Sequence, residues 1–172
     1  TITDTAHEMS QELAEEKGEF PNWPLSVYAK KNVKMRNAAL TTVAPTGSIS
    51  MFTDCSSGIE PNFALSYVKQ DKDGHQYPYL HRYFEKALKE SAWSDEKIQE
   101  VKEEIVKTGT IQGLNGLPDS LKKTFVVAMD ISAEDHMRMQ SAFQKRVDNS
   151  ISKTINFPNS ATKEDVLNGF IL

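Results

Sequence analysis

The sequence predicts an α/β fold that is rich in helices. Three short runs of β-branched and apolar residues, at 40–44, 63–68 and 151–157, are separated by longer segments whose apolar residues recur at helical spacing. Strands that alternate with helices are typical of an α/β layer or barrel. The 172 residues contain no internal repeat, so we expect one domain, or one large piece of a bigger domain.

The first 36 residues are expected to form one helix and an irregular connection. Residues 3–17 are rich in Glu and Ala and end at Gly18, a residue typical of helix ends. Residues 20–37 contain two prolines, three aromatic residues and four basic residues without a clear period, which predicts irregular structure.

A short buried strand is predicted before a tight loop. Residues 40–44 are apolar or β-branched and are bounded by Pro45 and Gly47, which favours a strand that ends in a turn. Residues 63–68 alternate apolar with small or polar residues and lead into the pair Asp73-Gly74, which is typical of turns. We therefore expect a second strand there.

Four further helices are predicted from apolar stripes and capping residues. The expected inward-facing residues are Leu80, Tyr83, Phe84, Ala87 and Leu88 in the first, Ile98, Val101 and Ile105 in the second, Leu121, Phe125 and Met129 in the third, and Met139, Ala142, Phe143 and Val147 in the fourth. Ser94, Pro118 and Ser132 stand where the last three of these begin, and Gly109 stands where the second ends. Residues 162–172 predict one last amphipathic helix.

Composition and charge exclude several classes of protein. With 38% hydrophobic and 26% charged residues, the chain is neither disordered nor collagen-like. A net charge of -4, with acids and bases interleaved, argues against a nucleic-acid polymer as partner. No apolar run approaches the roughly 20 residues needed to cross a bilayer, and no secretory signal opens the sequence, so we expect a cytoplasmic protein. Because the chain begins at Thr1 rather than Met, we expect it to be processed or excised from something longer.

Cysteine and histidine usage limits the possible sites. Cys55 is the only cysteine, which excludes an intramolecular disulfide and a multi-cysteine zinc site. We expect it to be a small buried thiol. The histidines are scattered without a His-x-x-x-His pair, so no metal site formed by the protein is expected.

The best candidate site is the loop Pro45-Thr46-Gly47-Ser48-Ile49-Ser50. It connects the first predicted strand to the first turn of a short helix, where unpaired N–H groups and the helix dipole favour an anion. Gly47 lets the main chain come close to a ligand, and Thr46, Ser48 and Ser50 offer hydroxyl donors. A phosphate or diphosphate fits this chemistry. A plain turn with a helix cap is the alternative, because neither the lysine-bearing phosphate loop nor the three-glycine dinucleotide fingerprint is present.

Several longer strings, in colinear order, carry a family resemblance. They are residues 37–51, 55–61, 63–65, 110–113, 130–132, 136–140 and 147–156. Together they resemble the adenosylcobalamin-dependent (class II) ribonucleotide reductases, in the C-terminal part of the catalytic barrel domain. The resemblance is clear over residues 37–172.

This resemblance implies a fold, an activity and a substrate site. The fold is a partial segment of the family's ten-stranded α/β barrel, and the activity is radical reduction of ribonucleoside di- or triphosphates to deoxyribonucleotides. Adenosylcobalamin is expected to be bound mainly by other parts of the complete enzyme. The implied substrate-binding positions are Pro45, Thr46, Gly47, Ser48 and Ile49.

Two neighbouring residues are candidates for supporting this loop. Ser50 ends the loop itself, and Glu60 lies between Ile59 and Pro61 in one of the matching strings. For Glu60 the alternative is a carboxylate bonded to nearby main-chain N–H groups without a role at the loop.

The residues that carry the radical chemistry of the family are not in this sequence. The Asn-x-Cys-x-Glu finger and two further active-site cysteines are missing, so the isolated chain is expected to be inert and to need the remaining reductase polypeptide. Exposed barrel-facing surface is expected to favour self-association. Two alternatives stay open: a metal-cofactor (class I) reductase, and a non-catalytic module that binds a nucleotide or assembles with a partner.

Overall fold

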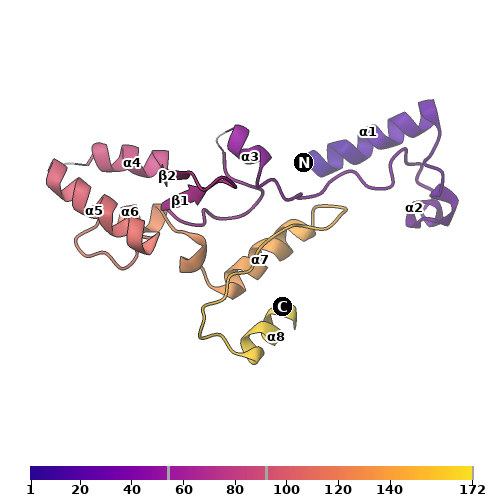
Figure 1. The fold of residues 1–172 in the computed structure, drawn as a ribbon. Coiled ribbons are helices and arrows are strands. Elements are labelled where there is room, and N and C mark those ends of the chain that lie inside the picture. Colours follow the sequence, from indigo (N-terminus) through magenta and orange to yellow (C-terminus); the bar gives the residue numbers. More distant parts are fainter. Residues whose placement is uncertain (54, 92, 172) are drawn as a thin grey trace. The chain divides into compact units, whose positions relative to one another are not determined.

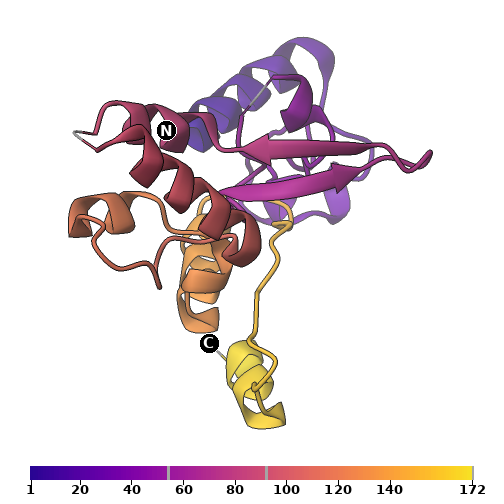
Figure 2. The same ribbon diagram turned by 60° about the vertical axis from the view of Figure 1, so that its left-hand side comes forward.

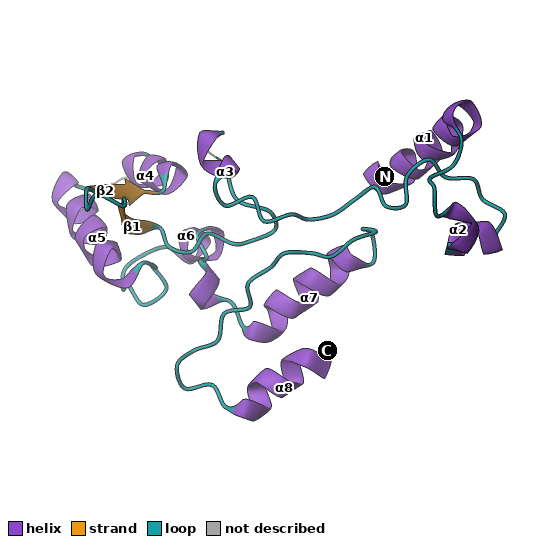
Figure 3. Cartoon of the chain, turned by 45° about the vertical axis from the view of Figure 1, so that its right-hand side comes forward, coloured by secondary structure: helices purple, strands orange, loops and turns teal. Residues whose placement is uncertain are grey.

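The chain forms two compact units. The computed structural model describes residues 1–53, 55–91 and 93–171. The first unit comprises Thr1–Ile59 and Met137–Lys153, and the second comprises Glu60–His136 and Thr154–Leu172. Helices and long connections make up most of the chain, and strands are few (Figures 1 and 3). Within the described residues, no helix is both long enough and apolar enough to cross a membrane.

The first unit begins with the predicted helix. Helix α1 (Ile2–Lys17) starts at Thr1, whose hydroxyl accepts a hydrogen bond from the Asp4 N–H, and ends at Gly18 with a φ of 78°. The following connection is less irregular than expected, because it contains the 3-10 helix η1 (Trp23–Leu25) and the short helix α2 (Val27–Lys30). The Ser26 hydroxyl caps α2 by accepting from two main-chain N–H groups, and this explains the local order.

Two of the predicted strands, at residues 40–44 and 151–157, are wrong. Residues 40–44 and 151–157 form no regular strand, and they meet through a single parallel bridge between Val43 and Ile151. The physical reason lies at the start of the first segment. There the N–H groups of Leu40 and Thr41 donate to the carboxylate of Asp148 instead of to carbonyls of a neighbouring strand.

The second unit contains a β-hairpin. Strand β1 (Ser66–Gln70) pairs with antiparallel strand β2 (Gln76–Leu80) (Figure 2). The register runs from Ser66 opposite Leu80 to Gln70 opposite Gln76. The predicted turn is confirmed, with Gly74 at a φ of 87° that suits glycine. The predicted strand begins three residues later than expected, and β2 was not predicted because Pro78 interrupts its strand signal.

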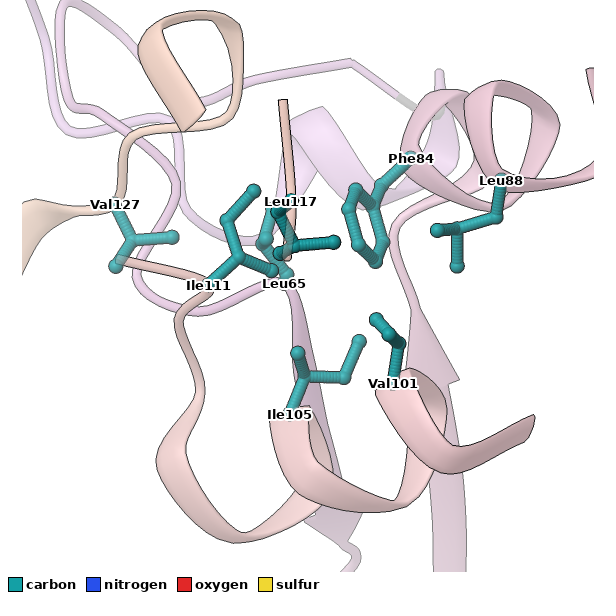
Figure 4. Packing of buried hydrophobic residues seen from close by; sticks show 8 residues of the cluster. All are labelled: Leu65, Phe84, Leu88, Val101, Ile105, Ile111, Leu117 and Val127. Carbon is teal, nitrogen blue, oxygen red and sulfur yellow. The ribbon is translucent and has the colours of Figure 1, made fainter. Parts of the chain in front are cut away.

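Helices pack beside this hairpin to form the main core. They are α4 (Arg82–Lys89), α5 (Asp95–Thr108), α6 (Asp119–Thr124) and the 3-10 helix η2 (Ala128–Asp130). The core residues are Leu65, Phe84, Leu88, Val101, Ile105, Ile111, Leu117 and Val127, which point toward one another in Figure 4. The predicted ends of α5 are confirmed, because Ser94 caps it and Gly109 closes it in the left-handed conformation.

Some residues predicted to face inward are exposed. Tyr83 is 57% exposed, because α4 is short and only the face with Phe84 and Leu88 meets the core. Helix α6 ends at Thr124, so Met129 lies beyond it in η2 and is also exposed.

The last two helices also differ in the face that is buried. In α7 (Ala133–Gln144) Met139 and Phe143 are exposed, whereas His136 and Met137 are buried. The buried side is fixed by the His136 ring, which bonds to the Ala128 carbonyl at 2.9 Å. Helix α8 (Lys163–Ile171) forms as predicted but buries none of its described residues, and the predicted end at Leu172 lies outside the described residues.

Candidate functional site

The loop at residues 45–50 leads from the Val43 bridge into helix α3 (Ile49–Phe52), so the predicted helix start is confirmed. Two hydroxyls hold the loop in shape. The Thr46 hydroxyl accepts from the Gly58 N–H at 2.9 Å and lies 3.2 Å from the Ser57 hydroxyl oxygen. The Ser50 hydroxyl, which is buried, donates to the Gly47 carbonyl at 3.2 Å. These two side chains are therefore engaged inside the protein.

The other residues of the loop face solvent. Pro45, Gly47, Ser48 and Ile49 are all exposed, with Ile49 at 62%. Within the described part of the chain, the main-chain N–H groups of Gly47, Ser48 and Ile49 have no hydrogen-bond acceptor. Such N–H groups at the start of a helix are available to an anion.

Gly47 is not required by the packing of the protein itself. A Cβ atom at this position meets nothing within 4 Å, and the backbone φ is not positive. Gly58, on the other side of the Thr46 hydrogen bond, differs because its φ of 50° favours glycine. The open side of Gly47 is therefore accessible to a ligand that approaches the main chain closely.

A carboxylate that the sequence did not single out holds the segment that enters the loop. Asp148 accepts from the N–H groups of Leu40 at 2.8 Å and Thr41 at 3.3 Å, and from the His7 ring at 2.9 Å. Burial acts to raise the pKa of Asp148, but the hydrogen bonds from His7, Leu40 and Thr41 outweigh it and leave the pKa below its usual value. Asp148 lies in the matching string 147–156, which was the only sequence signal for it.

Glu60 and Cys55 lie near the loop in sequence, and both have contacts of their own. The Glu60 carboxylate accepts from the Thr154 N–H at 2.6 Å, in the second unit. This agrees with the alternative of a bond to main-chain N–H, and a role of Glu60 at the loop stays a prediction.

The prediction that Cys55 is buried is wrong, because its thiol is exposed. It follows the end of α3, where Sγ lies 3.0 Å from the Thr53 hydroxyl and 3.8 Å from the Ser50 carbonyl oxygen.

One group of possible metal ligands occurs among the described residues, in the hairpin turn. The ligand atoms of Asp71, Asp73 and His75 all lie within 4.8 Å of one another. Asp71 already accepts from the N–H groups of Asp73 and His75, and from the Tyr77 hydroxyl. These hydrogen bonds close the hairpin turn, and they account for the close approach of the three side chains.

Comparison with known proteins gives the family. The model of the family "Ribonucleotide reductase, barrel domain" matches residues 1–172. A vitamin B12-dependent ribonucleoside-diphosphate reductase of Thermoplasma acidophilum is 40% identical over 170 residues, which are 98% of this chain and 22% of that protein. The protein of the same name from Mycobacterium tuberculosis is 36% identical over 165 residues, 96% of this chain and 23% of that protein.

A vitamin B12-dependent ribonucleotide reductase of Streptantibioticus cattleyicolor is 32% identical over 157 residues, which are 85% of this chain and 26% of that protein. The chain thus spans about a quarter of the length of these relatives. The helix-rich structure with a small sheet agrees with the predicted partial α/β segment. The chain belongs to the family of ribonucleotide reductase barrel domains.

Proposed function

We propose that this chain is the part of an adenosylcobalamin-dependent ribonucleotide reductase that holds the phosphate groups of the ribonucleotide substrate. The observation that carries the proposal is the open main chain at Gly47, Ser48 and Ile49, in a chain that matches the barrel domain over its whole length. The names of the relatives point to a ribonucleoside diphosphate as substrate and to vitamin B12 as cofactor.

The loop can bind phosphate through donors of two kinds. The N–H groups of Gly47, Ser48 and Ile49 donate to phosphate oxygens, and the Ser48 hydroxyl adds one further donor. Thr46 and Ser50 hold the loop in its shape through their internal hydrogen bonds. The exposed Ile49 side chain flanks the bound group, and the absence of a carboxylate in the loop avoids repulsion of the anion.

Adenosylcobalamin supplies the radical when it is bound to the complete enzyme, and we assign it to no residue of this chain. Cys55 is an exposed thiol beside Thr53, and it does not fit the family's redox-cysteine motifs. The radical cysteine and the redox pair therefore come from the remaining reductase polypeptide. The complete protein is proposed to act in the cytoplasm, where it supplies deoxyribonucleotides for DNA replication.

The alternatives are a class I reductase and a non-catalytic nucleotide-binding or assembly module. The names of the relatives favour the cobalamin-dependent enzyme over both. One assay separates the three. This chain is combined with the polypeptide that carries the rest of the barrel, and reduction of a ribonucleoside diphosphate is measured with and without adenosylcobalamin.

We expect no turnover by the chain alone, and turnover by the combination only when adenosylcobalamin is present. Turnover that ignores adenosylcobalamin assigns the chain to a metal-cofactor reductase. Nucleotide binding without turnover, with the partner polypeptide shown to be folded, favours the non-catalytic module.

A further inference from the structure

One carboxylate from a distant part of the chain binds the start of the segment that enters the phosphate loop. Asp148 Oδ2 accepts from the Leu40 N–H at 2.8 Å and the Thr41 N–H at 3.3 Å. In return the Asp148 N–H donates to the Thr41 hydroxyl at 3.1 Å. These contacts join residues more than a hundred positions apart, within the first unit.

A histidine from helix α1 orients this carboxylate. The His7 Nε2 atom lies 2.9 Å from Asp148 Oδ1, and the two side chains are only 28% and 16% exposed. The two carboxylate oxygens therefore have different partners, because Oδ1 contacts the ring and Oδ2 contacts the main chain. Despite partial burial, the lowered pKa of Asp148 keeps the carboxyl ionised at neutral pH.

The contacts continue from Asp148 toward the loop. The Asn149 N–H donates to the Thr41 carbonyl at 3.0 Å, and the Ser152 N–H donates to the Val43 carbonyl at 2.8 Å. Between them, the Thr42 hydroxyl donates to the Ser150 carbonyl at 2.8 Å. Val43 lies two residues before Pro45. The alignment of residues 40–43 with residues 148–152, which begins at Asp148, therefore extends almost to the first residue of the loop.

We propose that Asp148, oriented by His7, is a positioning residue that places the loop 45–50 for the substrate phosphates. The inference rests on the proposed function of the loop. Hydrogen bonds weaken steeply when their angle or length departs from the favoured range. A small displacement of residues 40–43 therefore weakens every donor of the loop toward the phosphate at once, although Asp148 itself lies outside the loop.

The chain offers a matched control for this proposal. In the hairpin turn Asp71 also lies beside a histidine, with 3.1 Å between its Oδ2 and His75 Nδ1, and also accepts from two main-chain N–H groups. This second pair belongs to the other unit, where its hydrogen bonds close the hairpin turn. Asp71→Asn therefore removes the same kind of carboxylate from a turn that does not lead into the loop.

The experiment uses the complete reductase that contains this segment. Binding of a ribonucleoside diphosphate and of the same ribonucleoside without phosphates is measured by calorimetry, for Asp148→Asn, Asp71→Asn and Gly47→Ala. We expect Asp148→Asn to raise the dissociation constant of the diphosphate roughly tenfold, a loss typical of a misplaced binding group. We expect unchanged affinity for the ribonucleoside, and no effect of Asp71→Asn on either ligand.

A second variant covers the case in which Asp148→Asn does not fold. His7→Ala leaves the bonds of Asp148 to Leu40 and Thr41 in place and removes only the orienting ring, so a smaller rise, roughly threefold, is expected for the diphosphate alone. Steady-state kinetics of the same variant should show a raised KM with kcat nearly unchanged.

The outcomes separate the two proposals. If Gly47→Ala weakens diphosphate binding and neither Asp148→Asn nor His7→Ala does, the positioning role is wrong and the loop function stands. If Gly47→Ala, Asp148→Asn and His7→Ala all leave diphosphate binding unchanged, the loop function itself is wrong. Equal losses for the diphosphate and the ribonucleoside would show a general structural role of Asp148 and overturn the inference.

Discussion

At the scale of single residues, the proposed phosphate site depends on Gly47 and Asp148. Nothing inside the described part of the protein requires a glycine at position 47, whereas Asp148 is engaged on both carboxylate oxygens. Gly47 therefore leaves space beside the main chain for a ligand, and Asp148 holds the segment that enters the loop.

The ionised state of Asp148 leads to a prediction about acid stability. Its pKa in the folded protein lies below the ordinary value of 3.8. The stability that it contributes is therefore present above about pH 4 and is lost as the pH falls through the lower folded pKa. Because hydrogen bonds to charged groups contribute about 1.5–3 kcal/mol, we expect Asp148→Asn to lower the free energy of unfolding by a similar amount at neutral pH.

Urea unfolding of both proteins at several pH values checks this prediction. The difference between the parent chain and Asp148→Asn should shrink as the pH is lowered from about 5 to about 3. A difference that stays constant over this range would contradict an ionised Asp148 as the cause.

At the scale of elements, helix α4 begins at a histidine. The His81 Nδ1 atom accepts from the Phe84 N–H at 3.3 Å and so caps the helix that contributes Phe84 and Leu88 to the core. The His81 ring also lies 5.9 Å from the Phe125 ring, between ring centres. Substitutions of His81 can separate the contribution of the helix cap from that of the ring contact.

We expect His81→Ala to lower the free energy of unfolding by about 1 kcal/mol, and His81→Asn to recover most of the loss, because asparagine is a good capping residue. Equilibrium unfolding in urea measures both. If His81→Asn costs as much as His81→Ala, the stabilisation comes from the ring contacts of His81 with Phe125, Tyr83 and Asn62 and not from the cap.

The success of sequence-based prediction also depends on the element. Helix α5 was predicted with both ends because its signals are local: Ser94 caps it and Gly109 adopts a φ of 74°. The strand predicted at residues 40–44 does not form, because its first N–H groups donate to Asp148. No local sequence pattern reveals that Asp148 lies beside this segment. The helix start after the loop 45–50 was also predicted from local signals. The role of this loop stays a prediction, and Asp148 was not singled out because it is distant from the loop in the sequence.

At the scale of the whole molecule, several large apolar side chains remain exposed. Helix α8 has no buried residue among those described, and Val166, Leu167, Phe170 and Ile171 are exposed along it. Contiguous exposed apolar surface favours association. The expected self-association of the isolated chain therefore has a defined candidate surface in α8.

We expect the isolated chain to self-associate with rising concentration, and Phe170→Glu to reduce this association by placing a charge on the apolar face. Leu25→Glu is the matched control, because Leu25 and Phe170 are both 86% exposed. Sedimentation velocity over a range of concentrations measures the effect. An equal effect of both substitutions, or a parent chain that stays monomeric throughout, would contradict the role of α8.

The central claim is that the loop 45–50 binds the substrate phosphates, and Ser48→Asp in the complete reductase tests it most directly. The added carboxylate stands among the N–H groups of Gly47, Ser48 and Ile49 and repels an anion. Ser48→Asn keeps a similar size without the charge. Calorimetric titration with a ribonucleoside diphosphate should give at least a roughly tenfold weaker dissociation constant for Ser48→Asp than for Ser48→Asn. An unchanged affinity of Ser48→Asp for the diphosphate would contradict the claim.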